Sequence, residues 1–464
     1  MPLAPIGLWL GLSLVLVACS SGSEGPRRWR WPLLAAIACA LGACLVLAWS
    51  TPVEPLPRWR GGLAFDQLAQ LLLPALWTGA AGAIIATLFL PSGRYEPAIA
   101  ALSTAIATAG LTSVNPLLTI ALLQAGALVI LGGLLVHDEG LAGHPLLNVA
   151  TSLKYLILTV VSGACLLMAM LLANFYAVNP DRVELTRIIT ALFVIGFGLA
   201  VGAIPFYFYV PDVFDAAPTL ATVSLAGPLQ CLAFVYLIRT AANGPWLLAN
   251  QHVSDVLAAA ALAGALLASV MAFGQYRVSR LLAFNALREV SWVAFGFATV
   301  SRAGWAGALV FLAVRCLSQP LLLVAAKVAK LRHGEIDLDK LGGLAKLLPL
   351  TTFGWCAGVF ASLGLPPAAS FWGMAGLLTA SSASGRLAET ALLASGALGL
   401  WRLGQATYSI FWASSAAAPD SSPEPPGAAW TLASIGFGLG FAGVVPRLLQ
   451  MPIDQLLGSL PFLR

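Results

Sequence analysis

The sequence predicts an all-α, polytopic membrane protein. Composition is the first reason, because 59% of the 464 residues are hydrophobic and only 9% are charged, whereas a soluble domain has about 25% charged residues. The mean hydropathy of +0.89 agrees with this class. Since one transmembrane helix takes about 20 apolar residues, a chain of this length has room for about 14 helices and little else.

Two proline-interrupted apolar segments are the second reason. PFYFYVPDVFDAAP begins at Pro205 in the first half of the chain, and LGLPPAASFWG begins at Leu363 in the second. At membrane depth a helix is broken only where protein or a water-filled cavity satisfies the freed backbone groups, and paired breaks in two halves are typical of a transport pathway. The prolines at these breaks are Pro205, Pro211, Pro218, Pro366 and Pro367.

Apolar runs separated by polar residues, glycine and proline place the individual helices. In the first part of the chain we expect them at 1–21, 31–49, 65–90, 98–111, 116–136, 147–175, 188–209 and 219–238. In the second part we expect them at 255–273, 281–300, 303–329, 348–381, 388–412 and 430–445. The first run ends in LVACSS, a pattern of lipoprotein cleavage sites, but its start MPLAPIG lacks the positive charge of a signal peptide. We therefore interpret 1–21 as the first transmembrane helix.

Basic residues between the predicted helices favour one orientation. With the N-terminus outside, the loops around Arg28, Arg277 and Lys330 lie on the cytoplasmic side, as the positive-inside rule requires. Arg58 and Arg187 fall outside in the same scheme, so the bias is incomplete. The sequence predicts a multi-pass protein of the cell inner (plasma) membrane, with both termini on the outer face.

Patterns of other protein classes are missing from the sequence. The seven cysteines lack CxxC spacing, and no histidine stands at metal-ligand spacing from another ligand. There is no P-loop, dinucleotide fingerprint or nucleophile motif, and no basic cluster is interleaved with aromatic residues. We expect no metal, no cofactor in this chain and no nucleic-acid partner.

Four ordered segments resemble the antiporter-like membrane subunits of respiratory complex I, in particular the subunit N (subunit 2) type of NADH-quinone oxidoreductase. They are KYLILTVVSGACLLMAMLLANFY from Lys154, IPFYFYVPDVFDAAPT from Ile204, RLLAFNALREVSW from Arg280 and SLGLPPAASFWGM from Ser362. The resemblance extends from about residue 115 to residue 412, and the PFxFxxPDVxxxAPT pattern is its most specific part.

The resemblance implies a domain organisation and partners. It implies two inverted five-helix repeats, each with one broken helix, at 98–241 and 242–414. Three helices would precede them at 1–97, and a linker with one transmembrane helix would follow at 415–464. The implied partners are the lipid bilayer and other membrane subunits of a complex I-like assembly, with quinone reached only through that assembly.

In this family, intramembrane charges and water beside the breaks are thought to carry protons, which requires side chains that change protonation near neutral pH. Matched position by position, the family's glutamate of the fifth helix falls at Gln124, an amide that cannot titrate. The family's lysines fall at Ala200, Leu229 and Met374. We therefore interpret the proton path as degenerate at these positions.

Lys154 and Glu289 remain as candidates for a proton path. Lys154 stands where the family also has a lysine, and it either serves the path or extends to the membrane interface along its own stem. Glu289 stands where the resemblance would place a histidine. With water held by Gln124, these two residues would form a substitute path.

Glu289 also has a structural interpretation, an ion pair with Arg315 of the next predicted helix. Such a pair would hold Glu289 in its ionised form and make it a poor relay, and arginine itself does not release its proton. In the first broken segment, Asp212 and Asp215 are interpreted as helix caps, because carboxylates accept hydrogen bonds from the free amides at a helix start.

Three functional hypotheses follow from the sequence. The first is a non-redox membrane-arm subunit of a proton-translocating, complex I-like (NADH-quinone oxidoreductase type) assembly, in which other subunits transfer electrons and this subunit's own proton conduction is lost or weakened. The second is an active proton or cation channel subunit that uses Lys154, Glu289 and water. The third is a stand-alone secondary transporter for a small solute.

Overall fold

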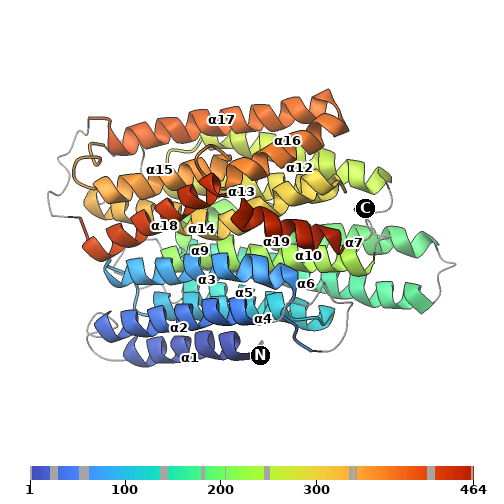
Figure 1. Cartoon of the computed structure of the whole chain (residues 1–464), viewed down its shortest axis with the longest axis horizontal. Helices are drawn as coiled ribbons and strands as arrows, with labels where there is room; N and C mark the ends of the chain where they lie inside the picture. Colours follow the sequence, from blue (N-terminus) through green and yellow to red (C-terminus); the bar gives the residue numbers. More distant parts are fainter. Residues whose placement is uncertain are drawn as a thin grey trace.

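The chain is a bundle of long helices that run side by side (Figure 1). The computed structural model describes residues 3–20, 30–51, 62–135, 145–178, 183–203, 205–244, 251–333, 338, 342–414, 424–460 and 463. Within these ranges, 11 helices are long and apolar enough to cross a membrane. The predicted fold class, an all-α polytopic membrane protein, is confirmed.

Three of the expected spans are not among those 11 helices, and each has a visible reason. The expected span at 98–111 is α4 (Glu96–Thr112), which has only 17 residues. The span at 348–381 is divided into α15 (Pro349–Leu363) and α16 (Ser370–Ser384), and the span at 388–412 is α17 (Arg386–Phe411), which carries charged residues. The division into two repeats at 98–241 and 242–414 stays a prediction.

The N-terminal part consists of α1 (Leu3–Ser20), α2 (Arg30–Ser50), α3 (Gln67–Leu88), α4 and α5 (Pro116–Leu135). A buried ion pair fixes the start of α3. Asp66 accepts a hydrogen bond from the Ala69 amide at 2.8 Å and caps the helix. Arg239, far away in the sequence, donates to the same carboxylate at 2.8 Å, and both side chains are buried.

The first break lies between α7 (Val183–Val201) and α8 (Tyr209–Ala216) and overlaps the start of the predicted segment at Pro205. The expected helix at 188–209 ends earlier, because Gly202 takes a left-handed conformation with φ of 71° that favours glycine. Before the break runs α6 (Pro145–Val178); after it come α9 (Thr219–Ser224), a π-helical turn η3 (Leu225–Leu229) that contains Pro228, and α10 (Gln230–Asn243).

The second break lies between α15 and α16. Gly364 ends α15 in the left-handed conformation with φ of 68°, and its amide donates to the Phe360 carbonyl. The Pro366–Pro367 peptide bond is cis, and α16 begins at Ser370. The other helices of this part are α12 (Gln251–Phe273), α13 (Val278–Ala298) and α14 (Arg302–His333).

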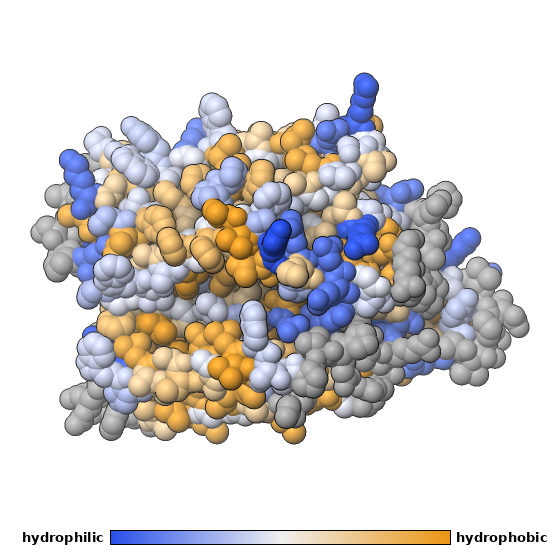
Figure 2. Space-filling model, viewed as in Figure 1, coloured by the Kyte–Doolittle hydropathy of each residue, from blue (hydrophilic) through white to orange (hydrophobic). Residues whose placement is uncertain are grey.

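The C-terminal part holds one expected and one unexpected helix. The expected span is α18 (Pro426–Val444), and the preceding linker at 415–423 lies outside the described residues. The unexpected helix is α19 (Arg447–Gly458), which packs on α3 and α14 through Ile453, Leu456 and Leu457. In Figure 2 hydrophilic residues gather over α19, whereas apolar residues cover much of the rest of this face.

Close approach of helices builds the interior. A Cβ atom at Gly79 of α3 would lie 1.9 Å from the Cys316 carbonyl oxygen of α14, so only glycine allows this contact. The spans Thr219–Asn243, Val278–Ala298 and Arg302–Arg332 are each 94% buried, more than the other candidate spans. Polar residues on these three spans therefore lie at the centre of the bundle.

Loss of the carboxylate that caps α3 should destabilise the protein. We expect Asp66→Ala to cost about 3–5 kcal/mol, because it leaves the Arg239 guanidinium buried without a counter-charge. Thermal unfolding of the purified protein measures this cost. The control is Asp454→Ala, which removes an exposed partner of Arg302 and should cost less than about 1 kcal/mol. Equal losses in the two variants would contradict the role of the Asp66 pair.

A buried polar axis between the two helix breaks as candidate functional site

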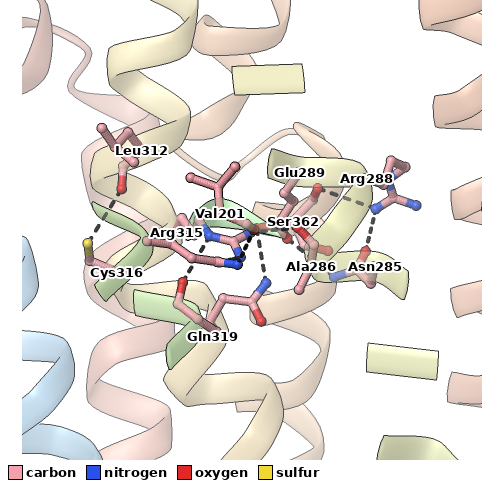
Figure 3. A network of polar contacts seen from close by, with 12 residues as sticks. Val201, Asn285, Ala286, Arg288, Glu289, Leu312, Arg315, Cys316, Gln319 and Ser362 are labelled. Carbon is pink, nitrogen blue, oxygen red and sulfur yellow. Dashed lines mark hydrogen bonds and ion pairs between the residues drawn. The ribbon is translucent and has the colours of Figure 1, made fainter. Parts of the chain in front are cut away.

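A chain of buried polar side chains links the two helix breaks (Figure 3). It starts at the Val201 carbonyl, at the end of α7, and reaches the Ser362 carbonyl, in the last turn of α15. We call its side chains the polar axis, which in order of contact consists of Gln230, Arg315, Glu289 with Gln319, Asn285 and Arg288. Each of these side chains belongs to a residue that is at most 3% exposed.

Arg315 of α14 is the centre of the axis. Its Nη1 lies 2.8 Å from Glu289 Oε2 and donates to the Ala286 carbonyl at 3.0 Å. Its Nε donates to the Ala226 carbonyl in η3 at 2.9 Å, and its Nη2 donates to Gln230 Oε1. The planar guanidinium, with donors in a fixed fork, thereby joins α10, α13 and α14.

Glu289 of α13 accepts hydrogen bonds from all sides. Besides Arg315, Gln319 donates from Nε2 to Oε2 at 3.0 Å, and Asn285 donates from Nδ2 to Oε1 at 3.2 Å. Both carboxylate oxygens are therefore occupied by donors within the chain. A buried charge that is paired and hydrogen-bonded in this way avoids most of the cost of leaving water.

At the first break, Gln230 connects the axis to the end of α7. Its Nε2 donates to the Val201 carbonyl at 2.8 Å. The last carbonyls of a helix have no partner within it, and the Tyr209 hydroxyl satisfies another by donating to the Leu199 carbonyl at 3.0 Å. The residues of α8 and α10 thus supply donors that the broken helix lacks.

At the second break, Arg288 connects the axis to the end of α15. Its Nη2 donates to Asn285 Oδ1 and lies 3.5 Å from the Ser362 carbonyl. The guanidinium lies over the Trp292 ring at 4.8 Å, a cation–π contact. Gly399 of α17 provides the space, because a Cβ atom there would lie 1.5 Å from Arg288 Nη1.

The axis holds two arginines and one carboxylate, so it carries an excess of positive charge. The C-terminal ends of α7 and α15 meet the two ends of the axis. A helix C-terminus carries a partial negative charge of about half an elementary charge, which stabilises the excess. Arginine stays protonated in proteins, so Glu289 is the titratable member of the axis.

Lys154 belongs to a different cluster, near the first break but at the surface. Its Nζ lies 2.5 Å from Asp212, and its side chain is 47% exposed. Arg280 reaches Asp212 at 3.5 Å and Asp215 at 3.3 Å, and Arg277 also pairs with Asp215. Arg280 precedes Glu289 by nine residues, about 14 Å along α13. The structure therefore does not bring Lys154 to Glu289.

The interpretation of Asp212 and Asp215 as helix caps is wrong. The N-cap position of α8 is Phe208, and no side chain caps this helix. Both aspartates instead pair with basic residues of α6 and of the start of α13. The reason is competition, because a cationic partner offers a carboxylate a stronger hydrogen bond than a neutral amide does.

The positions that the resemblance assigns to family charges lie in packed surroundings. Gln124 on α5 packs on Gly163 of α6, where a Cβ atom would lie 2.6 Å from Gln124 Cδ. Leu229 covers Gly126, and Met374 covers Gly364 at the second break. Ala200 lies near the end of α7, and its backbone carbonyl accepts a hydrogen bond from the Tyr209 hydroxyl at 3.4 Å.

Several residues of the axis were not identified from the sequence. Gln230, Asn285, Arg288 and Gln319 were not named as site residues, although a usable signal existed. Asn285 and Glu289, and likewise Arg315 and Gln319, are four residues apart and share a helix face. Gln230 comes directly after the π-helical turn that contains Pro228, and such turns are frequent at functional sites.

Two broken helices with a buried polar axis between them define the class of antiporter-type membrane subunits. The chain belongs to the family described as NADH:quinone oxidoreductase/Mrp antiporter, transmembrane, whose model matches residues 140–398.

Individual relatives agree with this family. NADH-quinone oxidoreductase subunit 14 of Thermus thermophilus is 26% identical over 94% of this chain and 96% of its own length. Subunit N of Paramagnetospirillum magneticum is 27% identical over 75% of this chain and 74% of its own length.

Solved structures show the same fold. A chain of respiratory complex I from Thermus thermophilus with bound NADH matches with a TM-score of 0.84 and 18% identity over the full length of both chains. A chain of the Mrp complex from Dietzia sp. also matches with a TM-score of 0.84, at 17% identity over 99% of this chain and 96% of its own.

The central ion pair should show strong coupling between its two members. We expect Glu289→Met and Arg315→Met each to cost about 3–5 kcal/mol, because each leaves a buried charge unpaired. The double variant should be more stable than either single variant, because no charge is left alone. Thermal unfolding of the purified protein gives all three values. Additive losses would contradict the geometry of the pair, and the exposed Arg302 and Asp454 serve as a control pair without coupling.

Proposed function

We propose that this chain is a non-redox, antiporter-type membrane subunit of a proton-translocating assembly of the complex I type, and that its own proton conduction is lost or weakened. Other subunits would transfer the electrons, and quinone would be reached only through the assembly. The family, and relatives that align over nearly their whole length, support membership of such an assembly. The cell inner membrane is the proposed location, with both termini on the outer face.

The observation that carries the proposal is the state of Glu289. It is the titratable residue of the polar axis, and both of its oxygens are engaged by Arg315, Gln319 and Asn285. A proton that passed through Glu289 would have to break these contacts in turn. Apolar residues stand at Ala200, Leu229 and Met374, so these positions offer no titratable alternative. The axis therefore favours a structural role, in which the subunit packs between neighbouring membrane subunits.

A second candidate is an active proton or cation channel subunit. The side chain of Gln319 favours it, because its buried Oε1 has no hydrogen-bond partner within the described residues, and the same is true of the neighbouring Ser318 hydroxyl. Gln319 contacts Glu289, so its Oε1 could hold water beside the carboxylate. The pair of Lys154 and Asp212 would then collect protons at the surface near the first break.

Proton pumping by the assembled complex separates the two candidates. We expect Glu289→Gln and Lys154→Met to leave the number of protons pumped per electron unchanged, because neither side chain relays a proton in the first proposal. The amount of assembled complex should fall more in Glu289→Gln, which leaves Arg315 buried without a counter-charge. It should fall less in Lys154→Met, because Asp212 keeps Arg280 as a partner at 3.5 Å.

Proton uptake and electron transfer are measured together in membrane vesicles, with Glu389→Gln, a half-buried residue in the first turn of α17, as a matched control. A lower proton-to-electron ratio in the first two variants, with normal assembly, would instead support the active channel.

Isolation from the native membrane tests membership of an assembly. After gentle purification of the tagged chain, we expect other integral membrane subunits and a quinone-reducing arm to co-purify in fixed ratio. Mass spectrometry and gel filtration give the composition. A stable, monodisperse chain that has no partners and carries specific solute flux in vesicles would overturn the proposal and support the stand-alone transporter.

A further inference from the structure

An apolar cavity of about 160 Å³ lies between the two halves of the chain, beside the first break. Residues of α7, α12 and α13 and of the break itself line it, among them Phe193, Phe197, Phe206, Leu257 and Ala261. Thr190 and Ser291 are the lining residues that have polar side chains. The polar axis does not use this space.

The cavity has one end near the membrane surface and one end at the break. Thr190, near the start of α7, and Leu257, near the start of α12, mark the first end. A hydrogen bond from Ser254 of α12 to the Ala298 carbonyl, the last residue of α13, places these helix ends together. Pro205 and Phe206 mark the second end, where α7 has already stopped. The space is therefore shaped for a chain that enters from one membrane surface.

The lining of the cavity favours a hydrocarbon ligand. A cavity of about 150 Å³ lined by apolar side chains stays free of water and takes up apolar molecules. The membrane brings acyl chains to this part of the fold, because α7 and α12 expose apolar Ile188 and Val256 near their starts. An acyl chain would replace an empty space with van der Waals contacts to the phenylalanine rings.

A basic residue stands where a headgroup would lie. Thr190, Phe193, Val194 and Phe197 line the cavity at helical spacing on α7. Arg187 continues the same stripe one turn earlier, and it is exposed. A guanidinium binds a phosphate group through parallel hydrogen bonds. The basic side chain therefore lies next to the apolar cavity, as the phosphate of a phospholipid lies next to its acyl chains.

We propose that this cavity is a phospholipid site, in which one acyl chain fills the space between α7, α12 and α13 and Arg187 binds the phosphate. The acyl chain would act as a wedge between the two halves of the chain at the first break. The site depends on the membrane fold and not on proton conduction, so its test is independent of the pumping experiments.

Photochemical labelling tests the site in the complete assembly. The assembly is placed in phosphatidylcholine nanodiscs that contain a phosphatidylethanolamine with a diazirine in the middle of one acyl chain. After illumination we expect labelled peptides from α7 and from the start of α12. Ala261→Phe fills the cavity and should abolish this labelling, and Ala261→Leu should reduce it partly. Ala259→Phe, on the exposed face of α12, is the matched control and should label like the wild type.

The headgroup contact has its own variant. We expect Arg187→Gln to weaken retention of the labelled lipid about tenfold, the effect of losing one charge-assisted hydrogen bond. Thermal unfolding shows whether each variant is folded. Equal labelling of Ala261→Phe and Ala259→Phe, or no labelling of the wild type, would overturn the proposal. Displacement of the label by decylbenzoquinone but not by unlabelled phosphatidylethanolamine would also overturn it, because the site would then belong to a quinone tail.

Discussion

A helix that breaks inside a bilayer leaves backbone carbonyls and amides with no water to bind, and every such group costs several kcal/mol unless protein satisfies it. Two breaks of this kind occur here, after Val201 and after Leu363. The polar axis satisfies carbonyls at both of them, through Gln230 at the first and Arg288 at the second. The rest of the interior is arranged around this requirement. Gly399 leaves room for Arg288, and Arg315 joins three helices at the centre.

The same requirement explains why arginine suits the axis. A guanidinium offers five donors in a fixed fork, and Arg315 uses them on two backbone carbonyls, one amide and one carboxylate. A lysine has fewer donors and titrates more readily when buried. Two arginines and one carboxylate whose oxygens are all hydrogen-bonded therefore form a stable connection between the two breaks. It is less suited to exchange protons, which requires groups that gain and lose them at neutral pH.

Much of the fold could be predicted from local sequence, because each break carries its own signal. Pro205 to Pro218 and Pro366 with Pro367 interrupt apolar runs, and a proline inside a helix removes a backbone hydrogen bond and favours a kink or a break. The exact end of α7 depended on Gly202, which takes a backbone conformation that other residues rarely adopt. The amphipathic α19 was missed because it is too short and polar to resemble a membrane span.

The candidate site was less accessible from sequence, because its contacts join helices that are far apart in the chain. Glu289 and Arg315 were considered as a pair from their place in adjacent helices, and they lie 2.8 Å apart. Nothing local shows that Gln230 faces Arg315, or that Ser362 faces Arg288. The aspartates of α8 were misjudged for the same reason, since their partners come from α6 and the start of α13.

The central claim is that Glu289, with both carboxylate oxygens bound by donors of the chain, makes the polar axis a structural connection and not a conduit for protons. A density map of the intact assembly that resolves ordered water molecules would test it most directly. The account predicts density that joins Glu289 to Arg315, Gln319 and Asn285, with no continuous row of water from Glu289 to either membrane surface. A continuous row of water through Glu289 to both surfaces would contradict the account.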